Sequence, residues 1–139
     1  MMWQLYAVMS AIFASLVAIL AKIGIAGIDS NLATAIRTVV ILIVAWGIVF
    51  FTVPLDSVKT LTAKNWTFLI LSGVATGLSW VCYFKALQMG DASRVAPVDK
   101  MSVALTIILA FVILGEKASV QVLIGGGLIV AGSLVMLWK

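Results

Sequence analysis

Five charged residues lie inside or beside long apolar stretches, where charge is energetically costly. They are Lys22, Arg37, Lys85, Asp99 and Lys100. Ionisable residues in such positions generally face a polar interior and mark a path for solutes or ions. Because four of the five are cations, they suit an anionic or zwitterionic solute better than a cationic one. The chain also lacks the deep carboxylate with which a proton-coupled exporter of cations usually works.

Five apolar segments must position these charges, and each is long enough to cross a bilayer core of about 30 Å. Of the 139 residues, 64% are apolar and 10% are charged, whereas soluble domains have about 25% charged residues. The runs do not alternate polar and apolar residues, as strands of a membrane barrel do. The sequence therefore predicts an all-α membrane protein with five transmembrane helices. Their expected ranges are 3–28, 32–53, 66–88, 93–114 and 120–138.

Lys22 and Arg37 are both about six residues from the connector that joins the first two helices, so each is about 9 Å below one membrane face. Asp99 has a similar depth if its helix begins near Ser93. We expect Lys22, Arg37 and Asp99 to line one mouth of a water-filled cavity. The alternatives are that the long cations reach the headgroups and that Asp99 forms a salt bridge with Lys22, Arg37 or Lys100.

Two aromatic residues and a proline lie near the same membrane face. Trp80 and Tyr83 are expected to wall the cavity, although aromatic residues at helix ends are often interface anchors. Pro97 removes a backbone hydrogen bond, which predicts a helix break of the kind that lines transporter cavities. Alternatively, the helix starts later and Pro97 lies in its first turn.

Small residues recur at helical spacing in the third and fifth segments and allow close approach of helices in lipid. We expect them to form helix-packing seams or a dimer interface. These residues are Gly73, Gly77, Gly125, Gly127, Ala131 and Gly132.

Several function classes are disfavoured by composition. Histidine is absent and the single cysteine, Cys82, has no partner, so we expect no catalytic site, metal site or cofactor. A net charge of +4 without a basic run argues against a nucleic-acid partner.

The charge bias that orients membrane proteins gives no clear direction here. Three cations flank the helices on the N-terminal side and six on the C-terminal side, where Lys22 and Arg37 lie too deep to count fully as loop charges. Single and dual orientation both stay open.

Three strings, at residues 83–100, 114–117 and 125–132, contain a YxxAL–ASxVAP–LGE–GxxxIxxG pattern. With these the whole chain, 1–139, resembles a single EamA domain, the repeat unit of the drug/metabolite transporter superfamily. Most members have ten helices, built from two repeats in opposite orientation. The resemblance implies that two copies pair as an antiparallel homodimer, that the first four helices wall the cavity, and that the fifth packs at the dimer contact.

The resemblance implies a secondary transporter of small metabolites or amino-acid-like solutes that works by alternating access. We expect it to be integral to a bacterial or archaeal plasma membrane, with lipid and a small solute as its other partners. The alternative is a non-transporting accessory subunit of a larger membrane complex, which would use the same glycine seams.

Overall fold

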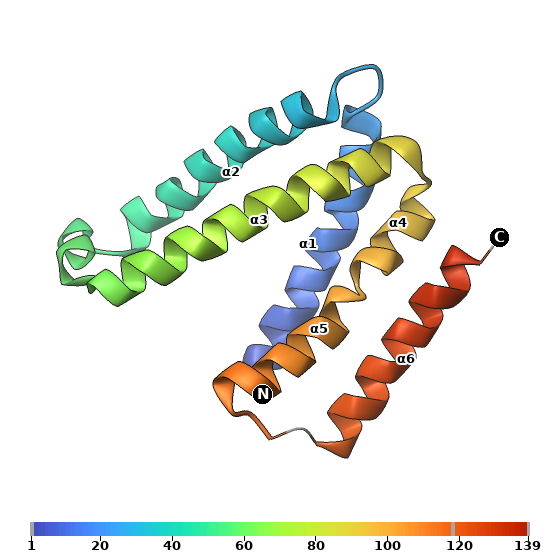
Figure 1. Cartoon of the computed structure of the whole chain (residues 1–139). Helices are drawn as coiled ribbons and strands as arrows, with labels where there is room; N and C mark the ends of the chain where they lie inside the picture. The colour runs from blue at the N-terminus through green and yellow to red at the C-terminus, as the bar shows by residue number, and fades with distance from the viewer. Residues whose placement is uncertain (1, 118, 139) are drawn as a thin grey trace. The chain divides into compact units, whose positions relative to one another are not determined.

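The computed structural model describes residues 2–117 and 119–138, and all their regular structure is helical (Figure 1). The fold class predicted from the sequence is therefore confirmed. In chain order the elements are α1 (Met2–Gly24), α2 (Ser30–Thr52), the 3₁₀ helix η1 (Leu55–Thr60), α3 (Ala63–Met89), α4 (Ala92–Asp99), α5 (Ser102–Leu109), the π-helix η2 (Ala110–Leu114) and α6 (Val120–Leu137).

Local capping explains where the helices begin and end. The Asp29 carboxylate accepts hydrogen bonds from the amides of Asn31, at 2.8 Å, and Leu32, at 3.2 Å, and so starts α2. The first helix ends at Gly24, not at Ile28 as predicted, because Gly27 has a left-handed φ of 79° in the turn that follows.

The third helix begins earlier than predicted, at Ala63 instead of Trp66. The Thr62 hydroxyl accepts a hydrogen bond from the Asn65 amide at 3.2 Å, which is the geometry of an N-cap. The predicted boundary followed the first aromatic residue and so missed the polar first turn.

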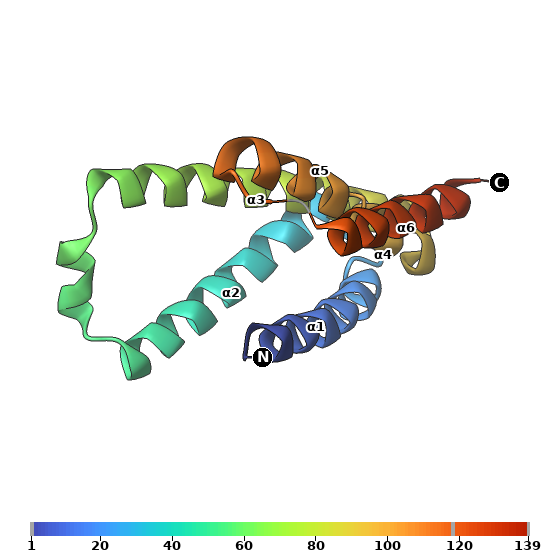
Figure 2. The same cartoon turned by 90° about the horizontal axis from the view of Figure 1, so that it is seen from below.

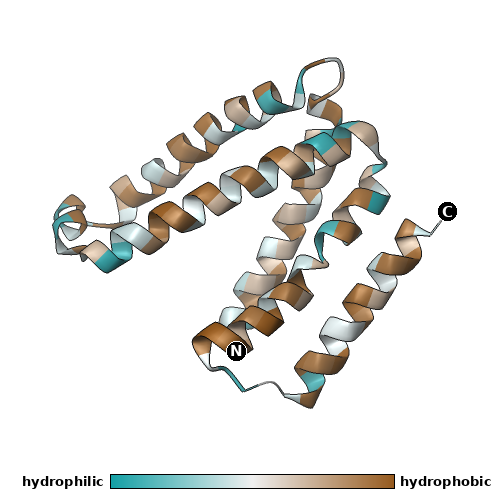
Figure 3. Ribbon diagram, in the orientation of Figure 1, coloured by the Kyte–Doolittle hydropathy of each residue, from teal (hydrophilic) through white to brown (hydrophobic). Residues whose placement is uncertain are grey.

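Five helical stretches of the described residues are long and apolar enough to cross a membrane: α1, α2, α3, the α4–η2 stretch Ala92–Leu114, and α6. Apolar residues make up most of each ribbon (Figure 3), and most of their large side chains are exposed. Phe51 is 86% exposed and Leu128 is 69% exposed. Surface of this kind requires a lipid environment or a protein partner to cover it.

The contacts divide the chain into two units, which are described separately. The central unit spans Leu20–Gln88, and the terminal unit contains the described residues of 1–19 and 89–139. The expectation of one transmembrane domain over 1–139 stays a prediction. Lys139, which entered the charge balance, lies outside the described residues.

In the terminal unit, α6 packs along α4 and α5 (Figure 1). Gly126 is the buried residue of the three consecutive glycines in α6, and a Cβ added there would lie 2.6 Å from Cδ1 of Ile107. A side chain at position 126 would therefore displace the end of the Ile107 side chain from the contact between α5 and α6.

Gly126→Ala is expected to destabilise the α5–α6 packing because Ile107 must move away from the added methyl group. Gly47→Ala is the matched control, since a Cβ at Gly47 meets nothing within 4 Å and gains the same helix propensity. We expect the two variants to differ by about 1 kcal/mol in free energy of unfolding. Unfolding in mixed micelles measures the difference, and equal stabilities would contradict this packing.

The central unit contains α2, η1 and α3. Figure 2 shows that α2 and α3 are far apart where η1 joins them and approach each other toward the start of α2 and the end of α3. Arg37, Trp80 and Tyr83, which were expected to line the cavity, belong to this convergent end of the helix pair.

Candidate functional site

Arg37 of α2 reaches two aromatic rings of α3 at the convergent end. Its guanidinium carbon lies 4.9 Å from the ring centroid of Trp80 and 5.1 Å from that of Phe84. Trp80 and Phe84 are four residues apart, so they share one face of α3. Both distances fit cation–π contacts, which are favourable away from water. Arg37, Trp80 and Phe84 are called the Arg37 cluster below.

Phe84 was not among the residues expected in the site, although it is 2% exposed and forms the buried wall of the cluster. Its spacing from Trp80 is a signal that could have identified it. Tyr83, which was expected in the site, makes an edge contact with Phe84, with ring centroids 6.2 Å apart.

The α2 face beside Arg37 carries two threonines whose hydroxyl groups are used within the helix. Thr34 donates to the Ser30 carbonyl and Thr38 to the Thr34 carbonyl, each at 2.8 Å. Both threonine hydroxyls therefore donate to carbonyls of their own helix. The guanidinium of Arg37 is then the main hydrogen-bond donor of the site.

Lys22, in the last turn of α1, reaches the C-terminal end of α3, where its ammonium donates a 2.6 Å hydrogen bond to the Leu87 carbonyl. The side-chain amide of Gln88, near the end of α3, donates a 2.8 Å hydrogen bond to the Ile28 carbonyl in the turn after α1. The last carbonyls of a helix lack intrahelical partners and carry partial negative charge, so a lysine there is stabilising. This capping role was not among the alternatives considered from the sequence.

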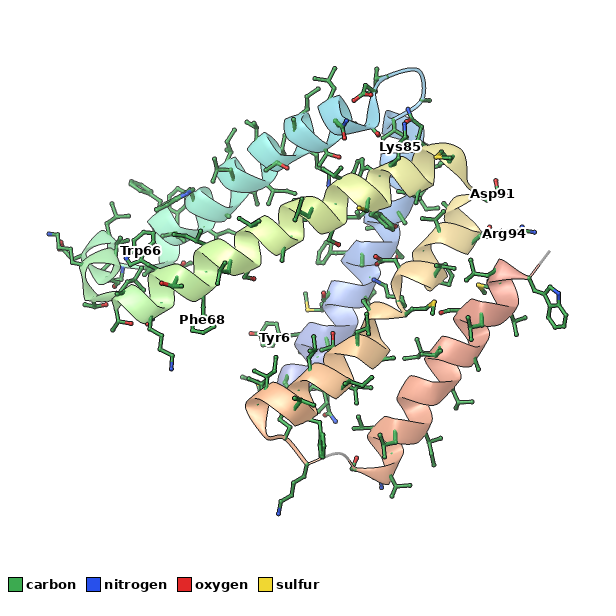
Figure 4. All side chains as sticks on the ribbon, in the orientation of Figure 1. Tyr6, Trp66, Phe68, Lys85, Asp91 and Arg94 are labelled. Atoms are coloured by element: carbon green, nitrogen blue, oxygen red, sulfur yellow. The ribbon has the colours of Figure 1, made fainter. Side chains whose placement is uncertain are left out.

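Lys22→Met is expected to loosen the end of α3, because it leaves the Leu87 carbonyl without this donor. A hydrogen bond from a charged donor typically contributes about 1.5–3 kcal/mol, and we expect about 1 kcal/mol for this partly exposed one. Lys85→Met is the control, since Lys85 is exposed near the same end of α3 (Figure 4). Hydrogen exchange at the last turn of α3 checks the prediction, and equal exchange in both variants would contradict it.

Asp99 and Pro97 belong to the terminal unit. The Asp99 carboxylate lies 3.3 Å from the ammonium of its neighbour Lys100, and both side chains are at least a third exposed. Such an exposed pair contributes little stability. Three salt-bridge partners were considered for Asp99: Lys22, Arg37 and Lys100. Within the terminal unit, Asp99 forms an ion pair with Lys100.

The structure places Pro97 inside α4, and the helix is interrupted at Lys100 and Met101. The Lys100 amide donates to the Pro97 carbonyl and the Met101 amide to the Val98 carbonyl, each at 3.0 Å, so three-residue turns replace the α-helical hydrogen-bond pattern at the break. The buried hydroxyl of Ser133 in α6 lies 2.8 Å from the Pro97 carbonyl and the same distance from that of Ile129. Sequence reasoning missed Ser133 because α6 was treated as a purely apolar packing helix.

The small residues expected in packing seams have open surroundings within the described chain. A Cβ at Gly73, Gly77, Gly125, Gly127 or Gly132 would meet no atom within 4 Å. Gly127 and Ala131 line a shallow apolar groove of about 360 Å³ between α5 and α6. Their role in a dimer interface stays a prediction.

The spanning helices and a charged group held between two of them define an integral membrane protein. The EamA-like transporter family model matches residues 1–138, and the chain belongs to that family. It is 47% identical over 134 residues, covering 96% of this chain and 95% of the relative, to "Uncharacterized transporter in cobO 3'region" from Sinorhizobium sp. No solved structure matches the chain. These similarities support a membrane transporter.

Proposed function

We propose that this protein is a secondary transporter of small metabolites or amino-acid-like solutes. The observation that carries the proposal is the Arg37 guanidinium, held between α2 and α3 by two aromatic rings in a chain of a transporter family. A cation kept at membrane depth needs a functional reason, because neutral residues would pack there at lower cost. Lys22, Tyr83 and Asp99 are proposed as further cavity residues.

The proposed working unit is a homodimer of two antiparallel copies that alternates between inward-open and outward-open states. One copy supplies five spanning stretches, and their apolar side chains are largely exposed. The open groove beside Gly127 and Ala131 offers a surface on which a second copy can pack. Two copies in opposite orientation would give the inverted repeat found in many transporters.

A flux screen in proteoliposomes tests the proposed activity. Purified protein is reconstituted alone, and uptake of labelled amino acids, organic anions and organic cations is measured with and without a proton gradient. Uptake above that of protein-free liposomes, for at least one solute class, is the expected result. No uptake of any class by correctly folded protein would favour the accessory-subunit alternative.

The proposed location is the plasma membrane of a bacterium or archaeon. An antiparallel dimer requires insertion in both orientations, and the charge bias is compatible with this if the deep residues Lys22 and Arg37 are not counted as loop charges. Reporters fused to the C-terminus, one active only inside the cell and one only outside, test this. Activity of both reporters is expected, and activity of a single reporter would contradict an antiparallel pair of identical chains.

A further inference from the structure

The Arg37 cluster contains a guanidinium whose closest described partners are aromatic rings. Trp80 and Phe84 both make cation–π contacts with it, in which the positive charge lies over the face of each ring. The five N–H donors of a guanidinium lie in its plane and point outward from the edge. Among the described residues, none makes a hydrogen bond or an ion pair with Arg37.

The carboxylates of the central unit are already used elsewhere. Asp29 caps α2 through two backbone amides. Asp56 pairs with Lys59 at 2.6 Å in η1, at the other end of the helix pair. Neither is in an ion pair with Arg37, so positive charge is in excess at the convergent end of α2 and α3.

Lys22 is a second cation at this end, where its ammonium donates to the Leu87 carbonyl. A guanidinium out of water is strongly destabilised unless its donors are paired. Within the central unit, Arg37 thus has aromatic neighbours and no carboxylate in an ion pair with it. A mobile anion would supply such a partner.

We propose that the edge of Arg37 binds an oxyanion group, a carboxylate or a phosphate, of the transported solute. The planar fork of a guanidinium matches such groups through two parallel hydrogen bonds. The rings of Trp80 and Phe84 lie beside the guanidinium that carries this fork. This inference rests on the proposed transport function and assigns the solute class to small organic anions and zwitterions.

The same chemistry could be supplied by a lipid phosphate, because arginine side chains near helix ends reach the headgroups. A lipid would occupy the edge permanently, whereas a transported solute must exchange with water. The experiment therefore offers soluble anions and lipid in separate arms.

The chain contains two arginines, Arg37 and Arg94, so one substitution isolates the group of interest. Arg94 is exposed at the start of α4 and belongs to neither the cluster nor the proposed cavity (Figure 4). In an Arg94→Lys background, phenylglyoxal modifies a single guanidinium, and mass spectrometry gives its rate. The full chain is purified in dodecyl maltoside without phospholipid, and the double variant Arg37→Lys/Arg94→Lys provides the background signal.

Succinate and inorganic phosphate are the anion probes, and tetraethylammonium chloride at equal ionic strength is the control. At about ten times its dissociation constant, a bound anion should slow the modification of Arg37 about tenfold. The tetraethylammonium salt should leave the rate unchanged. Slowing by either anion probe but not by the control supports the proposal.

Three results would overturn the proposal. Arg37 could fail to react when no anion is present, which would mean that its edge is covered by protein. Its rate could be unaffected by both anion probes. Protection could also come from phosphatidylglycerol micelles alone, which would assign the site to a lipid headgroup.

This test is separate from the flux screen. Anion protection without flux of any solute would contradict the proposed transport function and leave the binding site intact. Flux of cations or neutral solutes without anion protection would contradict the solute class alone.

Discussion

Uptake by the Arg37→Gln variant is expected to fall at least tenfold below that of the wild type, for the solute that the wild type carries. Glutamine keeps much of the side-chain length but removes the positive charge and the paired N–H fork. Loss of a charge-assisted hydrogen bond typically costs about 1.5–3 kcal/mol, which corresponds to about a tenfold to hundredfold loss in affinity. Initial uptake rates over a range of solute concentrations measure the effect.

Two further variants separate charge from geometry. Arg37→Lys keeps the charge without the planar fork, so intermediate uptake is expected. Lys59→Gln is the matched control, because Lys59 is exposed in η1 and pairs with Asp56 away from the cluster. Equal uptake by all three variants, with unchanged folding, would show that Arg37 is not part of the solute path.

Phe84→Ala is expected to cause the largest loss of stability in the central unit. Phe84 is 2% exposed, packs against Tyr83 and lies below the Arg37 guanidinium. Truncation leaves a void and removes a cation–π partner. We expect a loss of about 2 kcal/mol in free energy of unfolding. This is less than the roughly 3–5 kcal/mol lost in soluble cores, because a side chain that moves from lipid into the protein gains no hydrophobic free energy of transfer from water.

Phe68→Ala is the control on the same helix, since Phe68 is 63% exposed (Figure 4). Its removal deletes an equal volume from a surface that lipid covers. Unfolding of both variants in mixed micelles measures the difference in free energy. If Phe68→Ala proved as destabilising as Phe84→Ala, the packing at the convergent end would be wrong.

The spanning helices could be predicted because bilayer thickness dictates the length of an apolar run. All five stretches were found, and α6, Val120–Leu137, differs from its expected range by one residue at the C-terminal end. Boundaries set by capping were harder to place. Asp29 and Thr62 begin helices through side chain–backbone hydrogen bonds, and apolar-run length contains no information about such bonds.

The candidate site was predictable in part. Buried charge at membrane depth singled out Arg37, and helical spacing placed Trp80 near the same membrane face. The structure brings these two together. The four-residue spacing of Phe84 from Trp80 places both on one face of α3, but this spacing does not show that Phe84 is buried, because its burial depends on how α2 and α3 rotate toward each other.

Contacts to backbone carbonyls were the least predictable. Lys22 reaches the Leu87 carbonyl and Ser133 reaches the Pro97 carbonyl, across large separations in sequence. Every residue has a carbonyl group, so residue types alone do not show which carbonyl accepts from a distant side chain. The Leu87 carbonyl is near the end of α3, and the Pro97 carbonyl is at the helix break, where it also accepts from the Lys100 amide.

The central claim is that two copies of this chain form a transporter without any other protein. Labelled protein reconstituted at falling density into liposomes tests it directly, with solute uptake and stepwise photobleaching recorded for each liposome. The account predicts uptake in liposomes that contain two or more protomers and none in those that contain one. Uptake by single-protomer liposomes, or absence of uptake whatever the number of protomers, would contradict it.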